Sequence, residues 1–210
     1  MAIKESSDEL SPTAVAPAPI LTRSGSNRTA KDYFALAVST CGVGYLPIAP
    51  GTWGSLLGVV FYLLLWSLSQ RVLFANAAMR RFSLVEVEIP QLAFMLIVIF
   101  LVSMAGIWAA AQAERLAQRK DPGIVVIDEV AGQMIALLPG PFYVHTWWSI
   151  ISAFVLFRAF DIWKPYPIRR LEKLESGLGI MADDIVAGIY AVIVNTALVS
   201  AYLLFFPGGR

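Results

Sequence analysis

Long apolar runs alternate with short polar or charged segments along the chain. Two of the runs, Gln91–Ala113 and Ile185–Phe206, reach the length of about 20 residues that a helix needs to cross a bilayer. Backbone polar groups within lipid must be paired inside their own segment, so these runs are predicted to be helices. The predicted helices cover Leu56–Leu68, Gln91–Ala113, Val130–Leu138, Trp147–Phe157 and Ile185–Phe206. The pattern predicts an all-α, polytopic membrane bundle of about five apolar helices, of which the short third one either crosses the membrane or is re-entrant.

Composition agrees with a membrane protein. Hydrophobic residues make up 58% of the 210 residues and charged residues 15%, whereas soluble domains have about 45–50% and about 25%. The net charge of +1 gives no electrostatic reason to expect a nucleic acid as partner. A single cysteine and a single histidine exclude disulfide frameworks and the usual zinc sites. We expect neither Cys41 nor His145 to act as a nucleophile, so carboxylates, basic side chains, hydroxyls and backbone groups must carry any chemistry.

The N-terminal segment differs from the rest of the chain. Residues 1–32 are polar, contain proline and serine, and have no apolar run. They are predicted to be a disordered tail, and they lack the apolar stretch that a secretory signal peptide requires. The membrane-embedded domain is therefore expected to cover residues 33–210.

The distribution of basic residues tests the number of crossings. With five crossings, 12 Lys and Arg residues fall on the side of the N-terminal tail and 4 fall on the other side. Merging the third and fourth helices into one crossing gives 8 on each side. Positive charge favours the cytoplasm, so five crossings are preferred and the tail side is predicted to be cytoplasmic. A re-entrant third helix would give the same distribution.

Four polar segments beside the apolar runs combine glycine, proline and charge. In the arrangement with five crossings all four fall on the cytoplasmic side, so they are expected to form one site. They are residues 42–55 (GVGYLPIAPGTWGS), 127–132 (IDEVAG), 157–167 (FRAFDIWKPYP) and 177–188 (GLGIMADDIVAG).

Carboxylates are the most prominent chemistry in these segments. Placed together at the end of a membrane bundle they would repel one another and take up protons, unless a cation bound them. Mg²⁺ prefers oxygen ligands and often binds carboxylates together with a substrate phosphate. The alternative is that some of them only cap helix N-termini, above all Asp183. The candidate metal ligands are Asp128, Glu129, Asp161, Asp183 and Asp184.

Basic residues accompany one of these carboxylates. Arg158, Asp161 and Lys164 follow one another at spacings of three residues, which places them along one helical face. Either Arg158 and Asp161 form a surface ion pair, or Asp161 binds a metal while Arg158 and Lys164 hold phosphate oxygens. Pro165 disfavours helical geometry at Lys164, so the helix is expected to end there.

The glycine-rich segment offers a second way to hold an anion. Backbone N–H groups from Gly51 onward, near a helix N-terminus, can bind phosphate with the hydroxyls of Thr52 and Ser55 as partners. Gly54 and Gly58 also form a GxxxG pattern, whose simpler meaning is close helix packing.

Other basic residues are assigned to the surface. Arg169 and Arg170 are expected to meet anionic lipid headgroups. Lys120 is predicted to lie in an ordinary charged loop.

The blocks PIAPGTWGS, DEVAG, FRAFDIWKPYPIR and GIMADDIVAG, in this order, resemble the phosphatidylglycerophosphatase A family of bacterial lipid phosphatases. The resemblance covers about Tyr33 to Ala191. One departure is Ile127, where family members commonly carry Trp; it is expected to alter packing more than chemistry.

The resemblance implies a Mg²⁺-dependent phosphomonoesterase of the bacterial inner membrane that converts phosphatidylglycerophosphate to phosphatidylglycerol. Its phospholipid substrate would meet a site that faces the cytoplasm. It further implies that the five carboxylates bind metal or activate water, with Asp128, Glu129, Asp161 and Asp184 as the catalytic set. Arg158, Lys164 and the turn of Gly51, Thr52 and Ser55 would hold phosphate.

Two alternatives stay open. The first is a broader phosphatase that acts on phosphatidate or soluble phosphomonoesters. The second is a small transporter or structural membrane subunit whose carboxylates form an ion path. A site at one end of the membrane helices, rather than at the midplane, argues against transport.

Overall fold

The structure, a computed structural model, describes residues 28–80, 84–138 and 146–205. All regular secondary structure within these residues is helical, which confirms the predicted all-α class. In chain order the elements are α1 (Ala30–Thr40), the 3₁₀ turn η2 (Val43–Tyr45), α2 (Pro50–Arg80), α3 (Leu84–Ala117), α4 (Ile127–Ala136), α5 (Trp147–Trp163), α6 (Ile168–Leu171) and α7 (Ser176–Phe205).

Among the described residues three helices are long and apolar enough to cross a membrane, whereas the sequence predicted about five apolar helices. The spans lie in α2 (Pro50–Val72), α3 (Glu86–Ala117) and α7 (Ser176–Phe205). α5 has 17 residues and α4 has 10, which correspond to about 25 Å and about 15 Å at 1.5 Å per residue. α4 therefore reaches through only about half of a hydrocarbon core of about 30 Å, as expected for the short third helix.

Each predicted apolar run lies mainly in a helix, and most of the helices extend beyond the runs. The exception is α4, which ends at Ala136, two residues before the predicted end at Leu138, and Phe206 of the last run lies outside the described residues. α2 already begins at Pro50, because proline fits the first position of a helix, where its missing N–H is not needed. α7 begins at Ser176 and includes Asp183 and Asp184. The interpretation of Asp183 as an N-terminal cap is therefore wrong.

α1 is a helix that the apolar pattern does not predict. It begins at Ala30, inside the stretch assigned to the polar tail, and Thr29 caps it. The Asp32 N–H donates to Thr29 Oγ1 (3.3 Å), and the Thr29 N–H donates to Asp32 Oδ2 (2.9 Å). Asp32 is also paired with Arg115 of α3 (3.1 Å), which holds α1 against the bundle. Residues 1–27 of the predicted tail, like His145, lie outside the described residues.

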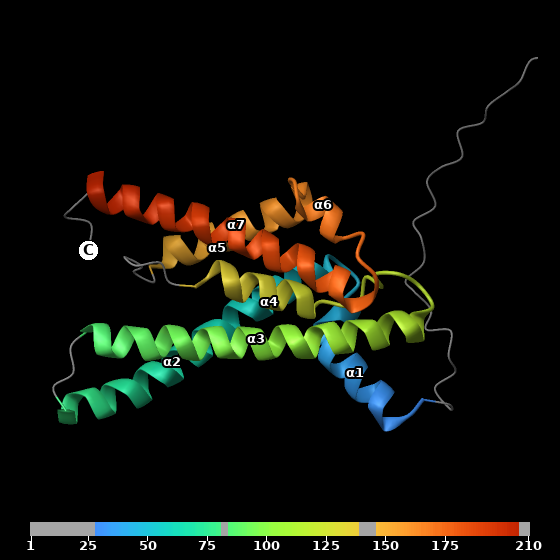
Figure 1. Cartoon of the computed structure of the whole chain (residues 1–210), viewed down its shortest axis with the longest axis horizontal. Helices are drawn as coiled ribbons and strands as arrows, with labels where there is room; N and C mark the ends of the chain where they lie inside the picture. Colours follow the sequence, from blue (N-terminus) through green and yellow to red (C-terminus); the bar gives the residue numbers. More distant parts are fainter. Residues whose placement is uncertain (1–27, 81–83, 139–145, 206–210) are drawn as a thin grey trace, which may run out of the picture.

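α4 is the central helix of the bundle. Nine of its ten residues are buried, and it packs against α2, α3, α5 and α7. In Figure 1 it lies between α3 on one side and α5 and α7 on the other. A short helix buried in this way positions its polar first turn by contacts from all sides.

Glycines allow α4 to approach its neighbours closely. A Cβ atom at Gly188 of α7 would collide with the Gly132 carbonyl oxygen of α4, and one at Gly132 would lie 2.6 Å from the Asp184 carbonyl oxygen. On α2, Cβ atoms at Gly54 and Gly58 would lie 2.9 Å from Val126 Cβ and 2.9 Å from the Val130 carbonyl oxygen. The packing interpretation of the GxxxG pattern is thus confirmed, and the backbone of α4 lies close to α2 and α7.

Candidate functional site

A cavity of about 750 Å³ lies at the end of the bundle where α4 and α7 begin. This end also carries α6 and the loop between α3 and α4 (Figure 1). All four polar segments contribute to the cavity wall, which confirms that they converge. The predicted site residues among its lining are Gly51, Asp128, Glu129, Arg158, Asp161, Lys164, Asp183 and Asp184.

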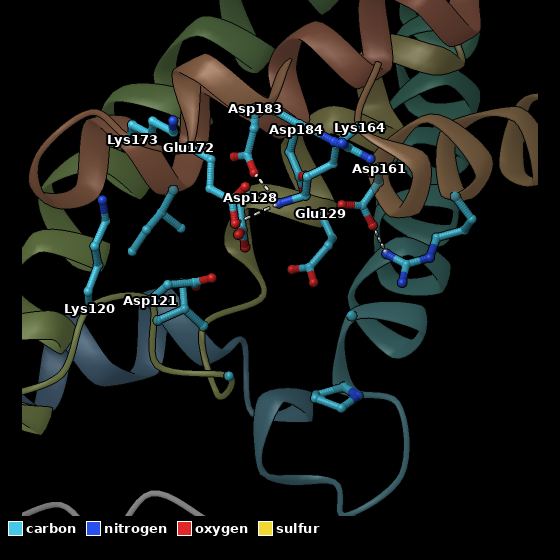
Figure 2. A pocket seen from close by; sticks show the side chains of 18 of the residues that line it. Lys120, Asp121, Asp128, Glu129, Asp161, Lys164, Glu172, Lys173, Asp183 and Asp184 are labelled. Atoms are coloured by element: carbon cyan, nitrogen blue, oxygen red, sulfur yellow. Dashed lines mark hydrogen bonds and ion pairs between the residues drawn. The ribbon is translucent and has the colours of Figure 1, made fainter. Parts of the chain in front are cut away.

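Three carboxylates from two helices form the centre of the site. Asp128 and Glu129 occupy the first turn of α4, and Asp184 comes from α7. One carboxylate oxygen from each residue can be chosen so that all three lie within 4.8 Å of one another. Figure 2 shows the side chains at the cavity. The close approach of α4 to α7 at Gly132 and Gly188 brings the two helices' carboxylates together.

Asp128 and Asp184 are buried and Glu129 is half-buried, and the three carboxylates lack sufficient hydrogen-bond donors. Asp128 is 8% exposed and Asp184 is 3% exposed. Among the described residues, Asp128 Oδ1, Glu129 Oε2, Asp183 Oδ1 and Asp184 Oδ2 have no hydrogen-bond partner. Burying such oxygens unpaired is costly. A hard cation would satisfy them, and the all-oxygen donor set fits Mg²⁺.

The other two predicted carboxylates are in ion pairs. Asp161 Oδ2 lies 2.6 Å from Arg158 Nη1, within α5. Asp183 Oδ2 lies 2.8 Å from Lys164 Nζ, which is also 3.4 Å from Glu172 Oε1. The spacing of Arg158 and Asp161 predicted either an ion pair or separate roles in binding phosphate and metal. The structure shows the ion pair, and both residues line the cavity. The five carboxylates therefore divide into a paired and an unpaired group.

Lys164 connects three elements at the cavity. It follows the last residue of α5 with a φ of 48°, as expected from Pro165. Burial alone would lower the pKa of Lys164, but the hydrogen bond to Asp183 and the charges of Asp183 and Glu172 raise it well above the usual lysine value. The lysine thus stays protonated and holds α5, the end of α6 and α7 together.

The predicted phosphate-binding turn is only partly at the cavity. Gly51 lines it, whereas Thr52 and Ser55 do not. Ser55 Oγ donates to the Gly51 carbonyl oxygen (2.9 Å), and the Thr52 N–H donates to the Ala49 carbonyl oxygen (2.9 Å). A Cβ atom at Gly51 would collide with the Glu129 carboxylate and lie 3.3 Å from Arg158 Nη1. Gly51 therefore leaves room for these two side chains.

Several lining residues have no counterpart in the sequence-based prediction. They are Lys120, Asp121, Arg169, Glu172 and Lys173. Lys120, read from the sequence as part of an ordinary loop, and Arg169, assigned to lipid headgroups, both lie on the cavity wall. Burial raises the pKa of Asp121 above the usual aspartate value. None of the five stands in an apolar run, so hydropathy gives no signal that could have found them.

Cys41 stays outside the site, as expected. It does not line the cavity. Burial and the nearby charge of Glu129 raise the pKa of the Cys41 thiol to about 11. A protonated thiol is a poor nucleophile.

Comparisons with known proteins give a consistent result. The family model described as phosphatidylglycerophosphatase A matches residues 36–199. A Haemophilus influenzae protein named phosphatidylglycerophosphatase A is 39% identical over 158 residues, which cover 75% of this chain and 83% of that protein. An Escherichia coli protein of the same name is 32% identical over 168 residues, covering 80% and 78%. A Bacteroides thetaiotaomicron protein, whose name proposes a phosphatidylinositol-3-phosphatase, is 38% identical over 154 residues, covering 72% and 84%. No solved structure matches the chain.

Proposed function

The chain belongs to the phosphatidylglycerophosphatase A family, and from this premise we propose that it removes the terminal phosphate of phosphatidylglycerophosphate at the cavity where α4 and α7 begin. Membership confirms the resemblance and the predicted enzyme class, a phosphatase of phospholipid metabolism. The observation that carries the site assignment is the group of Asp128, Glu129 and Asp184, of which one oxygen each lies within 4.8 Å of the other two.

We assign the metal site to this unpaired group. Asp128, Glu129 and Asp184 would hold Mg²⁺, which supplies charge stabilisation to the phosphoryl oxygens during hydrolysis. Their oxygens without donors support the assignment. Asp183 belongs to the same acidic region, but its ion pair with Lys164 makes it a support of the site rather than a primary ligand.

In this proposal the residues in ion pairs bind the substrate phosphate or hold the side chains around it in position. Arg158 lies on the cavity wall, and its planar guanidinium can donate hydrogen bonds to a carboxylate from one edge and to phosphate oxygens from the other. Asp161 fixes that orientation through the 2.6 Å contact, and in this proposal it takes a proton from the attacking water. Lys164 fixes Asp183, and so keeps the start of α7 against the end of α5.

The location of the site suits a substrate anchored in a bilayer. The cavity lies at one end of the long apolar helices, where a lipid headgroup would be within reach. The excess of basic residues on the side of the N-terminal segment supports a cytoplasmic orientation in the bacterial inner membrane.

The name of one relative makes a phosphoinositide a second candidate substrate. The Bacteroides relative, at 38% identity, carries a name that refers to a phosphoinositide. That lipid is also a phosphomonoester, and the site described here could bind its phosphate in the same way.

The test is phosphate release from lipids in detergent micelles, with either Mg²⁺ or EDTA. We expect rapid release from phosphatidylglycerophosphate with Mg²⁺, slower release from phosphatidylinositol 3-phosphate and phosphatidate, and none with EDTA. The Asp184→Asn variant should be inactive on all three lipids. Folded protein that releases no phosphate with Mg²⁺ would contradict the proposed reaction, and faster release from the phosphoinositide would change the substrate.

A further inference from the structure

Five basic side chains of the described residues line the cavity, and one of them, Arg169, donates from Nη2 to the Trp163 carbonyl oxygen (3.3 Å). Arg158 and Lys164 are each in an ion pair. Lys120, in the loop after α3, and Lys173, between α6 and α7, also line the cavity. Neither has an ion pair with a carboxylate in the part of the chain that the structure describes. Figure 2 shows these two lysines on one side of the cavity and Asp161 on the other.

The size of the cavity exceeds what one phosphate needs. Its volume of about 750 Å³ lies within the range of about 300–1,000 Å³ found for drug-sized ligands. A phosphate bound at the metal site that we propose for Asp128, Glu129 and Asp184 would leave the part near the two lysines free. Asp121 and Glu172 lie in the same part of the cavity as the two lysines (Figure 2), but Glu172 is already paired with Lys164. The two lysines therefore supply positive charge that the carboxylate centre lacks.

We infer that Lys120 and Lys173 bind a second phosphate group, the phosphodiester of the same lipid whose terminal phosphate lies at the carboxylate centre. This inference rests on the proposed function and narrows its substrate class. The substrates would be lipids with both a phosphomonoester and a phosphodiester, in preference to phosphatidate, which has only the monoester. The lysines are exposed, so they set affinity and selectivity without taking part in bond breaking.

The experiment measures kcat and KM in micelles of an uncharged detergent with Mg²⁺, for phosphatidylglycerophosphate and for phosphatidate. It compares the wild type with the double variant Lys120→Gln/Lys173→Gln. The matched control is Arg170→Gln, which removes one charge from the same end of the molecule. Arg170 does not line the cavity, and its guanidinium lies 4.8 Å from the centre of the Tyr166 ring.

We expect the double variant to raise KM for phosphatidylglycerophosphate about tenfold, since each exposed ion pair contributes at most about fivefold. Its kcat should stay within about twofold of the wild type, as expected when binding is lost equally in ground and transition states. KM for phosphatidate should not change, and Arg170→Gln should resemble the wild type on both lipids. Inhibition by phosphatidylglycerol, which has only the phosphodiester, should weaken about tenfold in the double variant.

Three outcomes would overturn the inference. One is an unchanged KM for phosphatidylglycerophosphate in the double variant, and another is unchanged inhibition by phosphatidylglycerol. The third is a difference between double variant and wild type that appears only after phosphatidylserine is added to the micelles and affects both substrates; the lysines would then bind neighbouring lipid headgroups. A wild-type protein without activity on phosphatidylglycerophosphate would contradict the proposed function itself.

Discussion

Two buried polar side chains of α7, one in each half of the helix, differ in whether their polar atoms are hydrogen-bonded. Asn195, in the half of the helix away from the cavity, is fully buried. Its Nδ2 donates to the Ser149 carbonyl oxygen (3.3 Å), and its Oδ1 accepts from Ser152 Oγ, both in α5. Asp184, at the cavity end, is 3% exposed, and its Oδ2 has no hydrogen-bond partner among the described residues.

The difference separates a structural from a functional use of polarity. Hydrogen bonds between helices within a membrane stabilise their association, and Asn195 serves this purpose between α5 and α7. Unpartnered carboxylates lower stability, and such groups persist where function requires them. The comparison therefore predicts that substitution of a cavity carboxylate lowers activity, whereas substitution of Asn195 lowers stability.

The largest effect is expected for Asp128→Asn. The amide has the shape of the carboxylate but no charge with which to hold a cation, so kcat should fall by about 100- to 1,000-fold, as when a charge-stabilising group is lost. In EDTA the thermal midpoint should stay equal or rise, because the substitution removes one of several crowded negative charges. Phosphate release and thermal unfolding in detergent measure the two quantities. Wild-type activity would remove Asp128 from the site.

The next effect is expected for Lys164→Met, which leaves Asp183 without its ion pair. Breaking a buried pair costs about 3–5 kcal/mol, and because Lys164 is 23% exposed we expect a loss near 3 kcal/mol in the free energy of unfolding. Activity should fall about tenfold as the start of α7 loses its support.

The matched variant is Lys164→Met/Asp183→Asn, which removes both charges. If Lys164 only positions Asp183, the double variant should regain stability and most of the activity. Stability regained without activity would instead assign Lys164 to the substrate phosphate.

A smaller effect, on stability alone, is expected for Asn195→Ala. Hydrogen bonds between membrane helices contribute about 0.6 kcal/mol on average, with a maximum near 1.7 kcal/mol. The free energy of unfolding should therefore fall by about that amount. Activity in the folded fraction should not change, because Asn195 does not line the cavity. A loss of kcat comparable to that of Asp128→Asn would contradict the division between the two regions.

Charges inside apolar patterns are what made the core of the site predictable. Asp128, Glu129 and Asp184 stand beside residues that are mostly apolar. The two segments that carry them share one membrane side with the other two polar segments in the five-crossing arrangement. That arrangement brings helix ends together whatever the details of packing. The helix cores and the convergence of the segments could therefore be derived before any coordinates.

The other features of the site and the fold depend on tertiary packing, which no local sequence pattern encodes. Lys120 and Lys173 stand in connections whose path is determined by the helices around them. α1 lacks the length of a membrane span, and it is attached through the burial of Leu36 in the core and the ion pair of Asp32 with Arg115 of α3. The division into paired and unpaired carboxylates also requires coordinates, because Lys164 pairs with a residue of another helix.

The smallest effect is expected for Thr52→Val, and it separates two explanations of the glycine-rich turn. If the turn holds phosphate through backbone N–H groups and hydroxyls, loss of the Thr52 hydroxyl should reduce activity, while Gly51→Ala, which retains its N–H, should be tolerated. The structure predicts the opposite order. The Thr52 N–H is already bonded to the Ala49 carbonyl oxygen, and its side chain does not line the cavity, so Thr52→Val should stay within about twofold of wild-type activity, since surface changes away from such features are usually small. Gly51→Ala should lose far more activity, because its Cβ would displace the Glu129 carboxylate and crowd Arg158. Phosphate release by the two variants, measured side by side at saturating Mg²⁺, decides whether this turn binds the substrate or makes room for the residues that do.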